Sequence, residues 1–412
     1  MSWSQHAIWW HVYPLGFVGA PIRPASDHDR ALTHRLGRLE AWLDYVIELG
    51  CNGLLLGPVF ESETHGYDTL DYDRIDPRLG DDADFDRLVA ACHRRGISIV
   101  LDGVFNHVGR GNQKFQRALA GGPDSPEAEL FRIDWTTGKA ADFEGHEALV
   151  ALNHDSPAVA DRIVEVMLEW LRRGIAGWRL DAAYTVPAAF WATVLPRVRE
   201  EFPDAWFLGE VIHGEYPEIV EASTMDTVTQ YRLWKAIWSS LKDANFFELE
   251  HALGDHNEFL GTFMPQTFVG NHDTTRIATL LPPDRAALAH VVLFTVGGIP
   301  SVYYGDEQAF GGTKYERHGG DDEVRPPFPD SPADLAPLGQ WAHRLIQDLI
   351  GIRRRHPWLT TARTSTVAIT NTEYAYDAVG AAGQTLRVEL SLEPKAVARI
   401  LEGDSTLLEI AV

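Results

Sequence analysis

The sequence has 412 residues, which suits one large domain with additions or two to three ordinary domains. Its 45% hydrophobic and 23% charged residues are typical of a globular protein with a large core. The net charge of −23 argues against nucleic acid and anionic membrane surfaces as partners. Two cysteines, Cys51 and Cys92, are too few for a disulfide framework or a zinc site, and both are predicted to be buried.

Short apolar runs alternate with amphipathic segments over most of the chain. The apolar runs predict eight strands: Ala7–Tyr13, Gly53–Val59, Ser98–Val104, Gly177–Leu180, Trp206–Val211, Thr227–Tyr231, Thr267–Gly270 and Ser301–Tyr304. Helical periodicity is found in five further segments: Thr33–Leu49, Phe85–Arg95, Ala158–Arg173, Ala188–Glu201 and Gln340–Arg355. This alternation predicts an α/β fold built on a parallel (β/α)8 barrel, or TIM barrel. A doubly wound open sheet is the alternative that periodicity leaves open.

Two segments break the alternation and define the predicted domains. Residues 107–155 are too long and too polar for a turn after the third strand, so we expect an insertion domain there. Residues 357–412 contain short alternating runs at Thr364–Thr370, Glu373–Ala378, Thr385–Leu390 and Thr406–Val412, which predict a small antiparallel β-domain. The barrel would then comprise residues 1–106 and 156–356.

The N-terminal residues lack the basic and apolar regions of a secretory signal. No run of about 18 apolar residues predicts a transmembrane helix. Together with the few cysteines, these features lead us to expect a cytoplasmic protein.

Reactive residues follow four of the predicted strands. The segments are Leu101–His107 (LDGVFNH), Gly177–Asp181 (GWRLD), Leu208–Val211 (LGEV) and Val269–Asp273 (VGNHD). In a parallel barrel, residues at the carboxyl ends of strands meet at one mouth, where the chemistry takes place. Each residue alone has a structural interpretation as a helix cap, an ion-pair partner or a hydrogen-bonded histidine. The set favours a catalytic site, and a metal site is less favoured because no close histidine pair such as HExxH is present.

These four segments resemble the signature regions of glycoside hydrolase family 13, the α-amylase family. They follow the family's order, and their spacing suits successive barrel strands. Further similarity is found in His65–Asp68 (HGYD), Ile75–Gly80 (IDPRLG) and Pro300–Glu307 (PSVYYGDE). The resemblance covers most of residues 5–355 and implies a barrel, an insertion after the third strand and a C-terminal β-domain.

The resemblance implies a role for each matching residue. Asp181 matches the catalytic nucleophile, Glu210 the general acid/base and Asp273 the third catalytic carboxylate, which grips sugar hydroxyls. The remaining matches are with substrate-site residues: Arg179, which orients the nucleophile; His107 and His272, which bind hydroxyls; Asp102, a structural aspartate; and Tyr67, an aromatic platform. The implied activity is retaining hydrolysis of α-glucosidic bonds, through a covalent glycosyl-enzyme.

The sequence also departs from many members of the family. After Asp181 it has Ala182-Ala183-Tyr184-Thr185, where many endo-acting amylases carry a Lys-His pair that contacts sugars on the leaving side. No N-terminal β-domain or starch-binding module is expected. We therefore predict short malto-oligosaccharides with α-1,4 bonds as substrates. No cofactor is expected to be required, although Asn106 matches a residue that often ligates structural calcium.

Two alternatives to hydrolysis remain open at this point. A transglycosidase or sugar isomerase of the same family would use the same covalent step with a sugar as acceptor. A non-catalytic carbohydrate-binding barrel is disfavoured because no predicted carboxylate has been lost. The sequence defines no oligomeric state.

Overall fold

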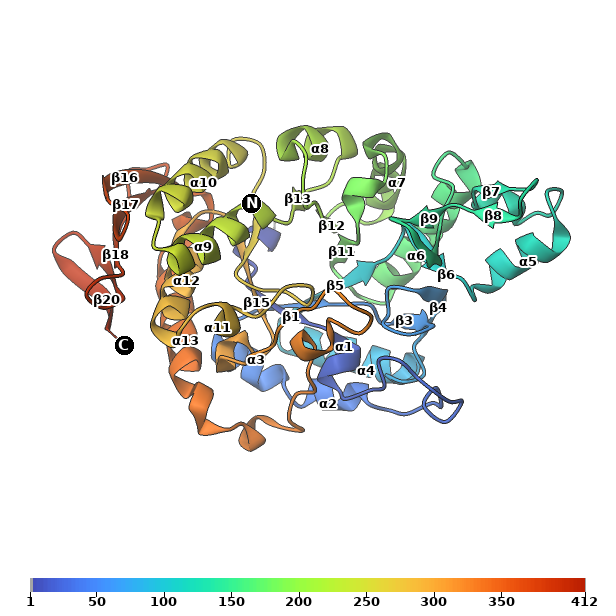
Figure 1. The fold of residues 1–412 in the computed structure, drawn as a ribbon, viewed down its shortest axis with the longest axis horizontal. Helices are drawn as coiled ribbons and strands as arrows, with labels where there is room; N and C mark the ends of the chain where they lie inside the picture. The colour runs from blue at the N-terminus through green and yellow to red at the C-terminus, as the bar shows by residue number, and fades with distance from the viewer. Residues whose placement is uncertain (1–2, 412) are drawn as a thin grey trace. The chain divides into compact units, whose positions relative to one another are not determined.

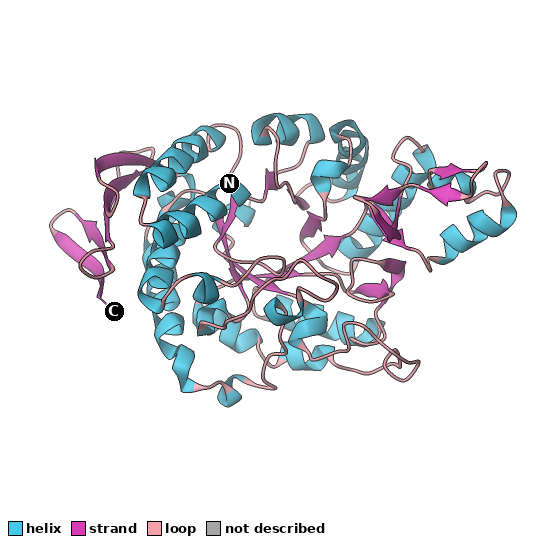
Figure 2. Cartoon of the chain, viewed as in Figure 1, coloured by secondary structure: helices cyan, strands magenta, loops and turns pink. Residues whose placement is uncertain are grey.

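The computed structural model describes residues 3–411, which divide into two compact units (Figures 1 and 2). The N-terminal unit contains Val12–Leu43 and Leu54–Asp226. The C-terminal unit contains the described residues up to His11, Asp44–Gly53, and those from Thr227 onward. One parallel sheet takes its eight strands from both units in the order β13-β12-β11-β5-β2-β1-β15-β14, and each of the eight predicted runs overlaps one of them. The predicted (β/α)8 barrel is confirmed.

The N-terminal unit contains four of these strands, of which β2 begins one residue before it: β2 (Gly53–Leu56), β5 (Ser98–Gly103), β11 (Gly177–Leu180) and β12 (Trp206–Gly209). Its helices are α1 (Pro14–Phe17), α2 (Leu36–Glu40), α4 (Asp82–Arg94), α6 (Pro157–Arg172), α7 (Ala188–Glu201) and α8 (Tyr216–Ser223). Asp81 caps α4, because its side chain accepts a hydrogen bond from the backbone N–H of Asp84. The Asp84 side chain in turn accepts one from the backbone N–H of Asp81, which completes a capping box. A Cβ on Gly177 would lie 2.1 Å from the carbonyl oxygen of Trp206, so β11 and β12 can pair here only because this residue is glycine.

The predicted insertion is built from short strands and one helix. β6 (His107–Gly109), β10 (His146–Ala151) and β9 (Asp142–Phe143) form a three-stranded antiparallel sheet. β7 (Ile133–Asp134) pairs with β8 (Lys139–Ala140), and α5 (Gln113–Gly121) is capped by Asn112. A separate hairpin, β3 (Phe60–Ser62) and β4 (Thr69–Ile75), precedes α4. Figure 1 shows α5, β7 and β8 together at the end of this unit.

The C-terminal unit supplies β1 (Trp9–Val12), β13 (Thr227–Val228), β14 (Gln266–Phe268) and β15 (Ile299–Tyr303). β15 pairs in parallel with β1 and β14, and a bridge from Thr229 to Gln266 joins the β13 segment to β14. Its helices are α3 (Leu43–Leu49), α9 (Tyr231–Asp243), α10 (Phe246–Phe259), α11 (Ile277–Leu280), α12 (Pro283–Thr295) and α13 (Gln340–Arg355).

A five-stranded antiparallel sheet ends the chain, with its strands in sequence order (Figure 2). The strands are β16 (Arg363–Ile369), β17 (Glu373–Val379), β18 (Thr385–Ser391), β19 (Val397–Glu402) and β20 (Ser405–Ala411). The predicted β-domain is confirmed, but we predicted four strands and missed β19. Two of the buried positions around it are Ala396 and Ala398, and alanine has little strand preference. The last predicted strand extended to Val412, which lies outside the described residues.

Aromatic side chains form much of the core within each unit. Six tryptophans are fully buried: Trp9, Trp10, Trp42, Trp170, Trp178 and Trp191. Cys51 and Cys92 are free and buried, as predicted. Within residues 3–411, no helix has the length and apolar character needed to cross a membrane.

Candidate active site

Three neighbouring strands bring the predicted residues of the N-terminal unit together. Asp102 lies near the end of β5, directly opposite Arg179 on β11. Leu180 pairs with Gly209 of β12, so Asp181 and Glu210 follow two residues that are in register. Alternate residues of a strand share a face, and Arg179 and Asp181 therefore project to the same side. The predicted meeting of Asp102, Arg179, Asp181 and Glu210 is observed.

Arg179 is the centre of this carboxylate cluster. Its Nη1 lies 2.8 Å from each carboxylate oxygen of Asp102 and 2.9 Å from Oδ1 of Asp181. Its Nη2 lies 2.6 Å from Oε1 of Glu210. All four side chains are buried. One guanidinium thus holds three carboxylates in a fixed geometry, a stronger constraint than the single pairing with the nucleophile that the sequence predicted.

The charge balance of the cluster favours retention of a proton. Three ionised carboxylates around one cation would leave a net negative charge in a buried region that solvent does not stabilise. Burial, reinforced by the charges of Asp181 and Glu210 and opposed by Arg179, raises the pKa of Asp102 to about 8. Burial alone would lower the pKa of Arg179, but Asp102 and Glu210 outweigh it and hold that pKa well above its usual value. The guanidinium stays charged, and the cluster carries a proton near neutral pH.

A backbone turn fixes the second oxygen of Glu210. Its Oε2 accepts a hydrogen bond of 2.9 Å from the backbone N–H of Ala182. Ala182 adopts a left-handed conformation with φ 45°, which turns the chain directly after Asp181. The same turn leads to Tyr184, whose hydroxyl donates to Glu144 of the insertion at 2.9 Å. Sequence reasoning identified Tyr184 only as a departure from the family and missed Glu144, which lies in a turn without a motif.

Tyr67 and His107 lie beside the cluster. The Tyr67 hydroxyl donates to Oδ2 of Asp102 at 3.0 Å. The His107 ring is 1% exposed, with Nε2 2.9 Å from the carbonyl oxygen of Tyr67 and Nδ1 3.1 Å from the amide nitrogen of Asn106. Burial lowers the pKa of His107 to about 4, so the ring is neutral and donates from Nε2. Phe143 of the insertion stacks on this ring at a centroid distance of 4.8 Å.

These contacts give His107 a clear positioning role. Its ring fixes the backbone of Tyr67, and Tyr67 in turn contacts Asp102. Both ring nitrogens already have protein partners, so binding of a sugar hydroxyl by His107 stays a prediction. Sequence reasoning missed Phe143, because a single aromatic residue in a polar insertion carries no pattern.

Asp273 and His272 belong to the C-terminal unit, in the loop after β14. Oδ1 of Asp273 lies 2.6 Å from Nη2 of Arg325, and its Oδ2 lies 3.0 Å from Nε2 of His272. Arg325 also donates from Nε to the carbonyl oxygen of His272 at 2.9 Å. The His272 side chain is buried, whereas that of Asp273 is 31% exposed. Arg325 was missed, because a lone arginine in a loop has no distinguishing pattern.

The contacts of Asn106, and those of Asp134 in the insertion, give calcium no distinct support. The Asn106 amide contacts His107, and the carboxylate oxygens of Asp134 accept hydrogen bonds from Thr136 and Thr137 in its own turn. Among residues 3–411, the single group of three or more His, Cys, Asp or Glu side chains close enough to share an ion is His34, Asp81 and Asp84. That group lies at the capping box of α4. Calcium ligation by Asn106 therefore stays a prediction.

Comparison with known families defines the class of the protein. The sequence model described as "Alpha amylase, catalytic domain" matches residues 35–147 and 143–331. The chain belongs to the α-amylase family, as its motifs predicted.

Individual relatives refine this assignment. The chain is 32% identical over 339 residues to a cyclomaltodextrinase of a Bacillus species, covering 76% of this chain and 60% of that protein. It is 30% identical over 334 residues to an intracellular maltogenic amylase of Bacillus subtilis, covering 74% of this chain and 56% of that protein. The chain thus spans less than two thirds of the length of these relatives.

Solved structures agree on the fold. A cyclic α-maltosyl-(1→6)-maltose hydrolase from Arthrobacter globiformis superimposes with a TM-score of 0.82 at 24% identity, covering 100% of this chain and 99% of that one. A debranching enzyme from Nostoc punctiforme gives a TM-score of 0.81 at 25% identity, covering 99% and 96%. The barrel with its C-terminal sheet is therefore an established architecture.

Proposed function

We propose that the chain is a retaining glycoside hydrolase that cleaves α-1,4-glucosidic bonds in short malto-oligosaccharides. The observation that carries the proposal is the pair of Asp181 and Glu210, held by the single guanidinium of Arg179 at the ends of adjacent strands. Neighbouring strands lie about 4.8 Å apart, which suits the separation of roughly 5 Å between the two carboxylates of a retaining enzyme.

The contacts of the two carboxylates suit different roles. Asp181 attacks the anomeric carbon, and its ion pair with Arg179 keeps the attacking oxygen charged and aimed. Glu210 donates a proton to the leaving oxygen and then takes one from the water that hydrolyses the glycosyl-enzyme. Asp273 is proposed as the third carboxylate, binding sugar hydroxyls more strongly in the distorted ring of the transition state.

The substrate class is supported by the turn after Asp181 and by the relatives. The segment Ala182–Thr185 has no Lys-His pair, and Tyr184 is held by Glu144. One relative is named for cyclic maltodextrins and the other for the formation of maltose, which supports an α-glucan substrate. A small soluble oligosaccharide is therefore the proposed partner.

A substrate panel tests this proposal. Maltotriose and a cyclic maltodextrin should be cleaved faster per bond than soluble starch, with isomaltose, trehalose and sucrose cleaved slowest. Free reducing ends should account for the bonds lost, because water is the proposed acceptor. Equal or faster cleavage of starch would refute the assigned substrate length, and transfer products in place of reducing ends would refute hydrolysis.

We also propose a cytoplasmic location, supported by the two free buried cysteines and by the relative named intracellular. When native cells are separated from their medium and then lysed, the protein should be found in the soluble cell contents. Its presence in the medium without lysis would refute this location.

A further inference from the structure

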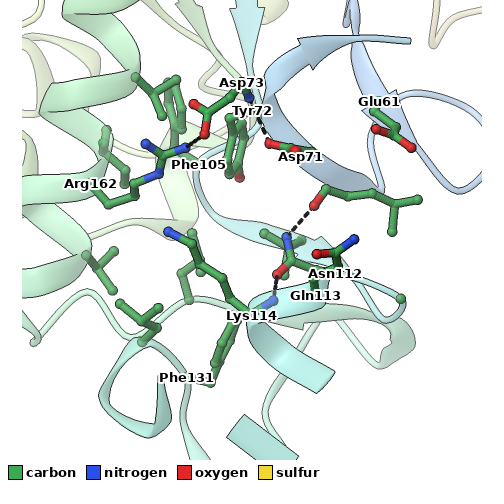
Figure 3. Close-up of a pocket in the computed structure, with 18 of the residues that line it drawn as sticks. Glu61, Asp71, Tyr72, Asp73, Phe105, Asn112, Gln113, Lys114, Phe131 and Arg162 are labelled. Atoms are coloured by element: carbon green, nitrogen blue, oxygen red, sulfur yellow. Dashed lines mark hydrogen bonds and ion pairs between the residues drawn. The ribbon is translucent and has the colours of Figure 1, made fainter. Parts of the chain in front are cut away.

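A cavity lies within the N-terminal unit, between the insertion and helix α6 (Figure 3). Its volume is about 250 Å³, and β4, α5 and α6 contribute to its walls. The floor is apolar and includes Phe105, Val108, Phe131, Ile163 and Val166. Asp102, Asp181 and Glu210 do not line it, so this cavity is separate from the carboxylate cluster.

Two cationic side chains lie over this floor. Figure 3 shows Lys114 of α5 reaching across the cavity toward Arg162 of α6. Arg162 is paired with Asp73 at 2.5 Å and with Glu165 at 3.6 Å. Lys114 differs, since no carboxylate of the described residues lies within 4.0 Å of its ammonium group. Partial burial, followed by the charge of Arg162, lowers the pKa of Lys114, as expected for a cation without a counterion.

Several other polar groups at the rim are already bonded within the protein. Asn112 uses its oxygen to cap α5 and its amide to donate to the carbonyl oxygen of Leu70. The Tyr72 hydroxyl donates to the carbonyl oxygen of Val104 at 2.5 Å. Glu61 lies 3.4 Å from Arg74. Lys114 is therefore the rim group best able to bind a new polar partner.

We propose that this cavity binds a small monocarboxylate with an apolar body, its carboxylate on Lys114 and its body on the apolar floor. The volume equals that of about eight water molecules at ~30 Å³ each, which suits a ligand of roughly ten non-hydrogen atoms such as octanoate. The acidic residues Glu61, Asp71 and Asp73 also line the rim and disfavour a doubly charged phosphate. A sugar is disfavoured because its hydroxyls would lose water over a floor without hydrogen-bond partners.

Isothermal titration calorimetry of the full chain with octanoate tests the proposal. We expect saturable binding with a dissociation constant on the order of 0.1–1 mM. Replacing Lys114→Met keeps the apolar stem and removes the charge, and it should weaken binding about tenfold or more. The matched control is Lys139→Met, which removes an exposed lysine of the same insertion outside the cavity and should leave binding unchanged. Octan-1-ol should bind at least tenfold more weakly than octanoate.

A second variant and a competition experiment locate the ligand. Leu130 is half-buried at the cavity, and Leu130→Trp should fill space there and abolish octanoate binding without loss of hydrolytic activity. Maltose should not displace octanoate. Absence of saturable binding, equal binding of octanol, an unaffected Lys114→Met protein or displacement by maltose would each overturn the proposal. Because the readout is binding, a failure here is distinct from a failure of the proposed hydrolase activity.

Discussion

Arg179 in the N-terminal unit and Arg325 in the C-terminal unit both hold predicted active-site carboxylates, but in different surroundings. Arg179 binds three carboxylates, all of them buried. Arg325 binds Asp273 at 2.6 Å and Asp321 at 3.3 Å, and these two side chains are 31% and 28% exposed. The first arginine stabilises a concentrated charge away from water, whereas the second orients carboxylates that water still reaches.

The two groups of carboxylates therefore suit different tasks. In the proposed reaction, bond making and proton transfer need carboxylates whose charge and position are fixed, and the carboxylates around Arg179 meet that need. Binding of sugar hydroxyls needs an accessible carboxylate, and Asp273 has that property. The two arginines should therefore differ in what their loss costs.

The largest expected effect is on folding stability and separates the two arginines. Arg179→Met leaves three buried carboxylates without a cation, and it should lower the free energy of unfolding by about 3–5 kcal/mol. Arg325→Met leaves carboxylates that water already reaches and should cost only about 1 kcal/mol. Urea unfolding at pH 7 measures both values. Equal losses for the two variants would contradict the comparison.

A smaller effect concerns the pH dependence of stability. The folded state raises the pKa of Asp102 to about 8 from an ordinary value of 3.8, so folded protein binds this proton more tightly than unfolded protein. The stability that this group contributes is present at low pH and is lost as pH rises from about 4 to about 8.

The variant Asp102→Asn removes that titration. Wild type should lose up to about 4 kcal/mol relative to the variant between pH 5 and pH 8, because each pH unit in this range costs about 1.4 kcal/mol. Urea unfolding at several pH values provides the measurement, and Asp321→Asn is the matched control at a half-buried carboxylate. A constant difference between wild type and Asp102→Asn across this range would show that Asp102 is ionised throughout.

The smallest effect concerns Tyr67. Tyr67→Phe removes the hydrogen bond to Asp102 but keeps the ring, so kcat should fall about fivefold with little change in KM. Tyr67→Ala also removes the ring on which the sugar is proposed to stack, and KM should rise as well. Steady-state kinetics on maltotriose separates the two. Identical kinetics for both variants would exclude a stacking role.

Much of this arrangement could be predicted from the sequence. Strand–helix alternation identified the barrel, because short apolar runs and amphipathic segments differ in periodicity. The motifs around Asp102, Asp181 and Glu210 identified the cluster, because the carboxyl ends of barrel strands meet at one mouth. The contacts of Arg179 with Asp102 and Glu210 were not predicted, since strand register is a property of the folded sheet. Phe143 and Arg325 were missed because each lies in a segment whose position depends on tertiary packing.

The most direct test of the central claim compares Asp181→Ala with Glu210→Ala on an α-glycosyl fluoride in the presence of azide. Without the nucleophile, azide must attack the substrate itself, so Asp181→Ala should give the inverted β-glycosyl azide. Without the acid, fluoride still departs and the glycosyl-enzyme forms, so Glu210→Ala should give the retained α-glycosyl azide. NMR of the products measures both configurations. Exchanged azide products, or an inverted sugar from the wild-type enzyme, would contradict the roles assigned to Asp181 and Glu210.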